Sequence, residues 1–255
     1  MSDDYFLRNR STIAIITGGT QGLGLAIATR LAREGAPGLV ISGRNTEKGE
    51  GAAEKLRSIG TDCLFVKADV STANDCYSLV EAALKRFGNV NGLVNSAGLA
   101  DRGTLLDTSL QLWERQFNTN ARGPFLLMQG VVRHLIDTGQ PGSIVNILSM
   151  VAHCGQSYLT PYSASKGALA TLTKNVANAF AAKRIRRNGI PDWMDGYPRR
   201  KRDPAEVPRR GRRLVGESGG CAAHGAVGEA RPVSWTGCLP AEPGVRRHDG
   251  SPGGL

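Results

Sequence analysis

A tyrosine and a lysine four residues apart, Tyr162 and Lys166, are the side chains best placed to do chemistry in this sequence. On a helix, positions i and i+4 share a face, so the ammonium group would lie close to the phenol. A tyrosine has an ordinary pKa of about 10, and a neighbouring cation lowers that pKa because it favours the phenolate. The pair therefore predicts a proton donor and acceptor that works near neutral pH.

Ser149 lies thirteen residues before the tyrosine and ends the apolar run 143–149. The run has the pattern of a buried strand, and the serine hydroxyl at its end can hold a substrate oxygen. Taken alone, a tyrosine and a lysine at this spacing are most often a solvated contact on a helix. The catalytic hypothesis therefore needs support from elsewhere in the chain.

A glycine-rich segment near the start of the chain gives that support. The apolar run 12–16 has the length of a strand, and residues 25–33 repeat with helical periodicity. Between them lies the segment 17–24, which holds four glycines. Strand, glycine-rich turn and helix in this order are the context of a dinucleotide-binding site. Glycines let the backbone approach a pyrophosphate closely, and the helix N-terminus favours the anion.

The two motifs, in this order and at this separation, resemble the short-chain dehydrogenase/reductase family over about residues 10–190. By this resemblance Asp69 and Val70 would contact an adenine, and the segment 95–98 matches the family's Asn-Ala-Ala-Gly with Ser96 replacing one alanine. The catalytic set that the resemblance implies is Asn120, Ser149, Tyr162 and Lys166. The cofactor-binding residues that it implies are Gly18, Thr20, Gln21, Gly22, Leu23, Gly24, Asp69, Val70, Asn95, Ala97, Gly98, Tyr162 and Lys166.

The family's chemistry implies a role for each catalytic residue. Tyr162 would pass a proton to the substrate carbonyl oxygen as a hydride arrives from the nicotinamide. Lys166 would lower the phenol pKa and hold the nicotinamide ribose, Ser149 would bind the substrate oxygen, and Asn120 would anchor a water that relays protons. The expected function is hydride transfer between NADP(H) and a small alcohol or ketone, with Tyr162 as general acid and base.

Strand-like and helix-like runs alternate along the chain, which predicts an α/β fold built from parallel β-α-β units. The resemblance implies a Rossmann-type doubly wound parallel sheet in a single domain. Strand-like runs lie at 12–16, 38–42, 62–67, 92–95, 142–149 and 185–190, and helix-like runs at 22–34, 46–59, 73–87, 110–136 and 161–182. Several candidate residues fall at the carboxyl ends of predicted strands, where such sheets bind ligands: Gly18, Asp69, Asn95 and Ser149.

The end of the second predicted strand bears on the choice of nicotinamide cofactor. NAD binders usually carry an acid there to hold the ribose hydroxyls, but the segment 40–45 has no acid and contains Arg44. An arginine can pair bidentately with a 2′-phosphate. NADP is therefore the expected cofactor, with NAD as the alternative. Asn45 and, more weakly, Ser42 are further candidates for the same pocket.

Composition changes abruptly near Pro191. From there to Leu255 the chain holds no isoleucine, phenylalanine, asparagine or glutamine, and seven of its twelve prolines lie between Pro198 and Pro252. Such a segment cannot bury enough apolar surface to offset its ordering entropy. We therefore expect a nucleotide-binding domain at 1–190 and a disordered tail at 191–255, with the C-terminal strand and helices of the family missing.

The genetic code offers an explanation for this tail. GC-rich codons that encode it can, when read one nucleotide later, encode peptides that look like the family's substrate loop and final strand. The hypothesis is that the residues after about Ile190 are the product of a frameshift. The alternative function is then a catalytically inactive or unstable product that at most binds cofactor.

The whole chain sets the remaining expectations. Its formal net charge is +10, and arginines cluster in the segment 198–213, but without interleaved aromatics, so nucleic acid is not an expected partner. Cys221 and His224 fit no common zinc spacing, and no metal is expected. No apolar run reaches transmembrane length, and the start of the chain lacks an apolar signal core. The five cysteines have no paired spacing, which fits a reducing compartment. A cytoplasmic location without membrane contact is therefore expected. A complete fold would form a homodimer or homotetramer that acts on a small alcohol or carbonyl compound.

Overall fold

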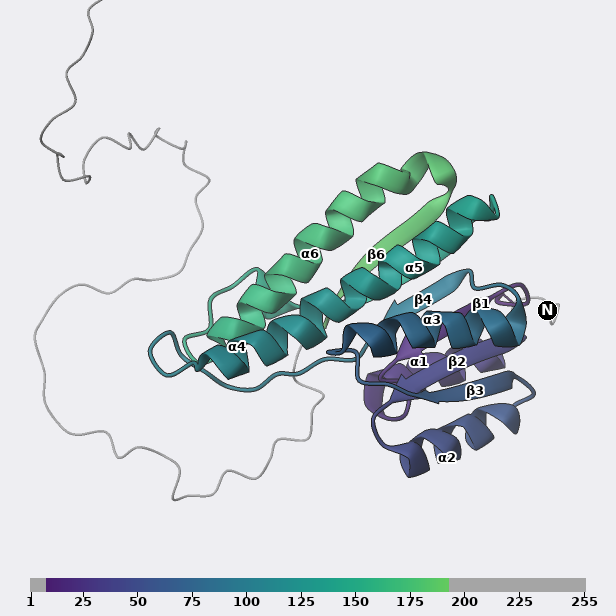
Figure 1. Cartoon of the computed structure of the whole chain (residues 1–255), viewed down its shortest axis with the longest axis horizontal. Coiled ribbons are helices and arrows are strands. Elements are labelled where there is room, and N and C mark those ends of the chain that lie inside the picture. The colour runs from purple at the N-terminus through teal and green to yellow at the C-terminus, as the bar shows by residue number, and fades with distance from the viewer. Residues whose placement is uncertain (1–7, 193–255) are drawn as a thin grey trace, which may run out of the picture. The chain divides into compact units, whose positions relative to one another are not determined.

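The computed structural model describes residues 8–192, and all of them belong to one unit of the chain, Met1–Arg199. Within this part, six parallel strands form one sheet in the order β3-β2-β1-β4-β5-β6 (Figure 1). The strands are β1 (Ile13–Thr17), β2 (Gly38–Gly43), β3 (Asp62–Lys67), β4 (Gly92–Asn95), β5 (Gly142–Ser149) and β6 (Ile185–Asp192). The predicted doubly wound parallel sheet is therefore confirmed. Five of the six strands begin at the predicted residue, and β1 begins one residue later than predicted.

Helices cover both faces of this sheet. They are α1 (Gly22–Arg33), α2 (Thr46–Arg57), α3 (Ala73–Phe87), α4 (Leu110–Phe117), α5 (Gly123–Asp137) and α6 (Thr160–Phe180). Strand side chains alternate between the faces, so Ile16 of β1 packs with Ala28 of α1 and Leu56 of α2, in one buried cluster. Ile15 packs on the opposite face with residues of α3, α5 and α6, among them Leu127.

The chain order reverses at the centre of the sheet. β1 pairs with β2 on one side and with β4 on the other, so the strands that follow β1 build outward in two directions. The crevice beyond the carboxyl ends of β1 and β4 is therefore the topological switch point, where doubly wound sheets bind ligands. All candidate residues named from strand ends lie at this edge.

The predicted helix-like run 110–136 is helical throughout, from Leu110 to Asp137, but it contains an irregular turn that was not predicted. α4 and α5 are separated by a π-helical turn, Asn118–Arg122, in which the Gly123 amide donates to the Asn118 carbonyl five residues back. Pro124 follows, and it has no N–H to donate to the Asn120 carbonyl, as an α-helix would require. The backbone of Gly123 also lies against β3's following loop, since a Cβ there would lie too close to the Val70 carbonyl oxygen.

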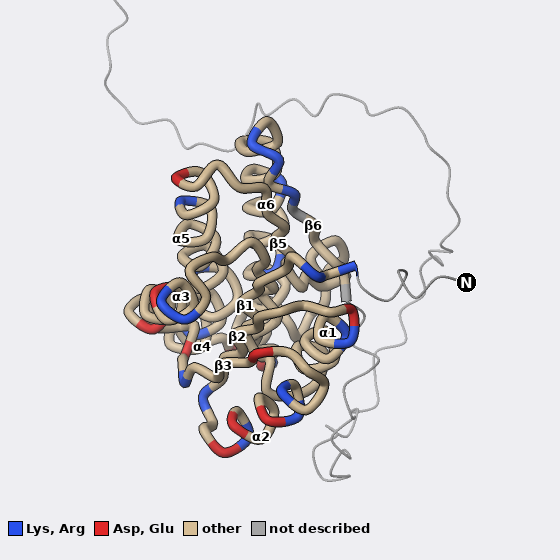
Figure 2. The backbone as a smooth tube through the Cα atoms, turned by 90° about the vertical axis from the view of Figure 1, so that its right-hand side faces the viewer, with Lys and Arg blue, Asp and Glu red and all other residues tan. Residues whose placement is uncertain are grey.

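Among residues 8–192, β6 is the last strand at one edge of the sheet. It runs to Asp192, two residues past the predicted end of the strand. The predicted disorder of the remaining tail, and the sequence features that suggested a frameshift, lie outside the described residues. Figure 2 shows acidic and basic residues interspersed along α2, and basic residues just after α6 and on β6.

Candidate functional site

Tyr162 and Lys166 lie in the first turns of α6, as the spacing predicted. Both are buried, at 7% and 5% exposure. The Lys166 Nζ lies 5.9 Å from the centroid of the Tyr162 ring. The same Nζ donates a hydrogen bond of 2.7 Å to the Ile147 carbonyl of β5. A backbone carbonyl thus holds the ammonium group in place beside the phenol.

Ser149 ends β5, two residues after the carbonyl that binds the lysine. It is 1% exposed, and its hydroxyl oxygen accepts a long hydrogen bond of 3.4 Å from the Val151 amide. β4 pairs with β5 only as far as Asn146, so the last three residues of β5 run past the end of the shorter strand. The end of β5 therefore extends past the end of β4, which borders the switch point.

Asn120 lies in the π-helical turn and is fully buried. Its side chain binds the backbone of Leu99 at both ends: Oδ1 accepts from the amide at 2.9 Å, and Nδ2 donates to the carbonyl at 2.8 Å. Nδ2 also lies 2.9 Å from the Ser165 Oγ, beside Lys166. The amide thereby joins the loop after β4 to the helix that carries the tyrosine and lysine.

The glycine loop has the geometry of a close turn between β1 and α1. Gly18 has φ +66°, and a Cβ there would lie 3.0 Å from the backbone of Ala97. A Cβ at Gly24 would lie within 2.3 Å of the Gly18 carbonyl oxygen, so the helix can pack on the loop only because no side chain is present. Thr17 Oγ1 accepts from the amides of Ser96 and Ala97, each at 3.1 Å, which fixes the loop after β4 beside the glycine loop.

The N-terminus of α1 carries no capping side chain. Gln21 holds the N-cap position in an extended conformation without a side-chain hydrogen bond, and the first turn contains no acid. The amides that begin a helix have no partner within it, and they attract an anion. Leu23 is 43% exposed and Gly22 has φ +55°, so this turn faces outward.

The end of β2 holds Arg44 as predicted, and its guanidinium Nη1 lies 3.9 Å from the Asp69 carboxylate at the end of β3. Its side chain is 69% exposed. Asn45 does something that sequence reasoning did not foresee: its Oδ1 accepts from the Lys48 amide at 2.8 Å and caps α2. Thr20 lies across from this strand end, since a Cβ at Gly43 would meet its side chain.

Asp69 is held by its own loop. Its Oδ1 accepts from the Ser71 amide at 2.9 Å, and its amide donates to the Asp75 carboxylate at 2.8 Å. Val70, next in the chain, is 7% exposed. The pair therefore lies at the carboxyl end of β3 as predicted, and an ion pair links it to Arg44.

Asn95 ends β4 and belongs to a buried network that was not predicted. Its Nδ2 donates to the Asn146 Oδ1 at 2.8 Å, and the Asn146 Nδ2 donates to the Thr173 Oγ1 at 2.8 Å. Gln116, which is fully buried and lies 3.4 Å from the Asn120 amide, was also missed. The sequence signal that could have identified these residues is a polar residue inside an apolar strand, as for Asn146, or on the apolar face of a helix, as for Gln116.

Gly98, in the loop after β4, lies close to both Asn120 and Lys166. A Cβ at this position would lie 3.7 Å from the Lys166 Nζ and 3.4 Å from the Asn120 Oδ1. The absence of a side chain leaves room between the loop after β4 and the catalytic helix. The structure therefore brings the glycine loop, the loop after β4, Asn120 and Lys166 into one continuous arrangement.

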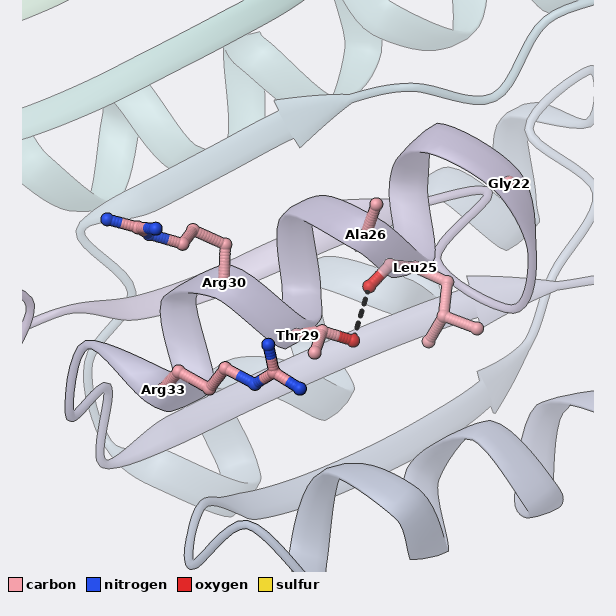
Figure 3. A pocket seen from close by; sticks show the side chains of 6 residues that line it. All are labelled: Gly22, Leu25, Ala26, Thr29, Arg30 and Arg33. Carbon is pink, nitrogen blue, oxygen red and sulfur yellow. Dashed lines mark hydrogen bonds between the residues drawn. The ribbon is translucent and has the colours of Figure 1, made fainter. Parts of the chain in front are cut away.

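A cavity of about 470 Å³ lies along α1, between Gly22 of the glycine loop and Arg33 (Figure 3). Figure 3 shows the side chains of Arg30 and Arg33 along it, and the hydrogen bond from Thr29 to the Leu25 carbonyl. Gly22 is its only lining residue that was predicted to bind cofactor. None of its lining residues belongs to the predicted catalytic set.

Comparison with known proteins gives the site its family. The short chain dehydrogenase family matches residues 12–192, which includes every predicted site residue. The chain belongs to the short-chain dehydrogenase family. A solved structure from Sinorhizobium meliloti, described as a short-chain alcohol dehydrogenase, is 30% identical with a TM-score of 0.70, and the match covers 74% of each chain.

Relatives of this short-chain dehydrogenase include two enzymes that are named for gluconate derivatives. The 5-keto-D-gluconate 5-reductase of Escherichia coli is 33% identical and matches 74% of this chain and 73% of its own. The 2-dehydro-3-deoxy-D-gluconate 5-dehydrogenase of Dickeya dadantii is 36% identical over 71% of both chains. An oxidoreductase of Thermotoga maritima is 34% identical over 77% of this chain and 76% of its own.

The protein is thus an oxidoreductase of the short-chain dehydrogenase family that acts on an alcohol or ketone. The family uses a nicotinamide dinucleotide, and the residues present fit such a group. Ser42 Oγ and Asn95 Oδ1 are buried polar atoms without a hydrogen-bond partner, and they lie near the carboxyl ends of β2 and β4, the two strands on either side of β1. Among residues 8–192, no cluster of three or more potential metal ligands occurs, and no helix has the length and apolarity to cross a membrane.

Proposed function

We propose that this short-chain dehydrogenase transfers a hydride between NADP(H) and a small alcohol or ketone, with Tyr162 as the general acid and base. The observation that carries the proposal is the position of the Lys166 ammonium group. It is buried beside the Tyr162 ring, bound to the Ile147 carbonyl, and 3.7 Å from where a side chain would begin at Gly98. A single cation thus lies near both the ring of the proposed proton donor and Gly98 in the loop after β4.

The proton chemistry follows from this placement. A cation close to a phenol favours the phenolate form over the neutral phenol. Tyr162 can then donate its proton to a carbonyl oxygen during reduction and accept one during oxidation. Ser149, at the end of β5, supplies a hydroxyl that holds the same substrate oxygen. The bound nicotinamide supplies the hydride.

Asn120 contributes through its backbone and its side chain. Its side chain is occupied by Leu99 and Ser165, so it sets the position of its own turn. Pro124 has no N–H, so it cannot donate to the main-chain carbonyl of Asn120. We propose that this Asn120 carbonyl binds the water that passes protons to Lys166.

The residues that would hold the cofactor lie in three places. The amides at the start of α1 and the glycine loop fit the pyrophosphate. Asp69 and Val70 would border the adenine, and the loop at Asn95, Ala97 and Gly98 would border the ribose and nicotinamide. Arg44 is the proposed partner of a 2′-phosphate, because the end of β2 offers an arginine and no acid.

The proposal is tested by Tyr162→Phe, which removes only the phenol oxygen. Turnover of ketones with NADPH should fall by a factor of about 100 or more, because a general acid contributes roughly that much. The dissociation constant for NADPH, measured by fluorescence, should change little. Tyr158→Phe is the matched control, since Tyr158 is 46% exposed four residues earlier and should retain full activity. Turnover retained by Tyr162→Phe would refute the assignment.

A second candidate function is cofactor binding without turnover. One observation favours it: the family match ends at residue 192, while the chain continues for 63 more residues. Saturating NADPH should raise the melting temperature in both cases, because a ligand that binds only the folded state stabilises it. A thermal shift without turnover on a panel of ketones and polyols would favour this second function. If NADPH causes no thermal shift and no turnover is detected, both functions are excluded.

A further inference from the structure

Three buried polar side chains, one each from β4, β5 and α6, are linked in series by hydrogen bonds near the proposed catalytic residues. Asn95 of β4 donates to Asn146 of β5, and Asn146 donates to Thr173 of α6, each at 2.8 Å. Thr173 in turn donates to the Leu169 carbonyl of its own helix at 2.7 Å. Asn146 is fully buried, and the other two side chains are at most 6% exposed. The chain crosses the three elements that carry the site.

Asn146 and Thr173 provide a second attachment of α6 to β5. The first is the hydrogen bond from Lys166 to the carbonyl of Ile147, the residue that follows Asn146. Thr173 comes seven residues after Lys166, which is about two helical turns, so both side chains project from the same face of α6. One attachment leaves a helix able to pivot on a strand. Two attachments along one face restrict both its rotation and its sliding.

The same asparagine connects this helix to the cofactor side of the site. Asn95 is the residue of β4 that pairs with Asn146 in the sheet, and their side chains are hydrogen-bonded as well. The chain leaves β4 directly after Asn95 and reaches Gly98, beside the Lys166 Nζ. A displacement of the Asn146 side chain would therefore shift both α6, which carries Lys166, and the loop after β4, which lies beside it.

An apolar cluster at this place would hold the helix less specifically. Burying an amide is unfavourable unless its groups are hydrogen-bonded, whereas apolar contacts are stable over a range of helix positions. Both ends of the Asn146 side chain have partners on other elements. The geometry therefore suits the fixing of one position more than the gain of stability.

We propose that Asn146, acting through Thr173, is a positioning residue. It fixes the position of Lys166 and Tyr162 on α6 relative to Ser149 and Gly98. The proposal rests on the proposed function for its kinetic consequence. Its structural consequence, a more loosely held start of α6 when the bond to Thr173 is lost, can be measured without turnover.

The test uses Thr173→Val, which keeps the side-chain shape and removes the hydroxyl. Thr173→Ser keeps the hydroxyl and serves as the rescue variant. Thr29→Val is the matched control, because Thr29 on α1 donates to the carbonyl four residues earlier, at 2.8 Å, just as Thr173 does (Figure 3). The three variants and the parent chain are compared for kcat, for KM of both substrates, and for hydrogen exchange of the α6 amides.

We expect Thr173→Val to lower kcat by about tenfold or more while KM for NADPH changes less than threefold, because small displacements of reacting groups slow chemistry strongly. Thr173→Ser should restore most of kcat, and Thr29→Val should leave kcat unchanged. The amides of residues 162–169 should exchange faster in Thr173→Val alone. Equal kinetics for the two valine variants, or a change in KM without a change in kcat, would overturn the proposal.

Failure of the proposed function gives a different result. The parent chain would then show no turnover, while hydrogen exchange would still decide the present proposal. Faster exchange at 162–169 in Thr173→Val, absent from Thr29→Val and reversed in Thr173→Ser, would support it. Unchanged exchange would refute it independently of catalysis.

Discussion

Lys166 is the residue at which the separate parts of the site meet. Its ammonium group lies beside the Tyr162 ring, binds a strand carbonyl and approaches Gly98. A buried cation is costly unless it is hydrogen-bonded, and the Ile147 carbonyl supplies such a bond. The charge is therefore held where it can act on the phenol.

Arg44 gives a prediction about cofactor choice at the same scale. Arg44→Asp should lower the ratio of kcat/KM for NADPH over NADH by at least about tenfold, because an acid at the end of β2 repels a 2′-phosphate and can bind ribose hydroxyls. The ratio is measured from initial rates with each cofactor. Arg133→Asp makes the same charge change on the exposed surface of α5 and should leave the ratio unchanged. An unchanged ratio in Arg44→Asp would refute the role of this arginine.

At the scale of elements, the π-helical turn between α4 and α5 shows how a local irregularity serves the site. The turn re-aims the helix so that Asn120 binds the loop after β4 and the second serine of the Tyr-Ser-Ala-Ser-Lys segment, Ser165. Its position follows from two neighbours, Gly123 against the Val70 backbone and Pro124 without an amide hydrogen. Such turns are frequent at functional sites.

The packing of α1 on the glycine loop gives a prediction for this pair of elements. Gly24→Ala should remove NADPH-induced thermal stabilisation, because its Cβ would collide with the Gly18 carbonyl oxygen. Gly51→Ala, in α2, is the matched control, since its Cβ would meet nothing within 4 Å. The control should stabilise the protein by about 0.5–1 kcal/mol, as alanine favours a helix over glycine. Equal behaviour of the two variants would contradict the close packing.

At the scale of the whole molecule, buried cysteines report whether the sheet has formed. Burial raises the pKa of the Cys63 thiol to about 12 and that of the Cys76 thiol to about 11. Both are at most 3% exposed, whereas Cys154 is exposed. Iodoacetamide at pH 8.5 should therefore label Cys154 in the folded protein and reach Cys63 and Cys76 only on unfolding, as mapped by mass spectrometry. Rapid labelling of all three without denaturant would show that the described fold does not form.

The same pKa shifts predict how stability depends on pH. Above the ordinary thiol pKa of 9.0, the unfolded chain releases protons that the folded chain still holds. The stabilising contribution of the neutral thiols is therefore complete below pH 9.0 and is lost as the pH rises toward about 11 and then 12. Denaturant titrations between pH 8 and 10.5 should show a decreasing free energy of unfolding, and Cys63→Ala should reduce this dependence.

The C-terminal residues give a prediction about the gene. The family match stops at residue 192, close to the abrupt change in composition near Pro191. If the residues after about Ile190 come from a frameshift, the DNA across codons 185–255, read one nucleotide later, should encode the substrate loop and final strand of a short-chain dehydrogenase. A DNA sequence that cannot encode such peptides would end this hypothesis.

The sequence by itself determined the fold class, the order of strands and helices, and the local placement of the candidate residues. These depend on short-range physics: apolar periodicity sets strands and helices, a spacing of four sets a helix face, and glycines allow a tight turn. Tyr162 and Lys166 were predicted on one helix, and Asp69 and Asn95 at strand ends, because neighbours along the chain suffice for that.

The tertiary structure alone decided which distant partners these residues have. The Ile147 carbonyl that binds Lys166, the Leu99 backbone that binds Asn120, and the link from Asn95 through Asn146 to Thr173 all join separate elements. Asn45 likewise caps α2 through a hydrogen bond from the Lys48 amide, which the sequence did not predict. Hydrogen bonds of this kind depend on the packing of strands and helices far apart in the chain, because a side chain's type restricts what it can bind but not what lies beside it.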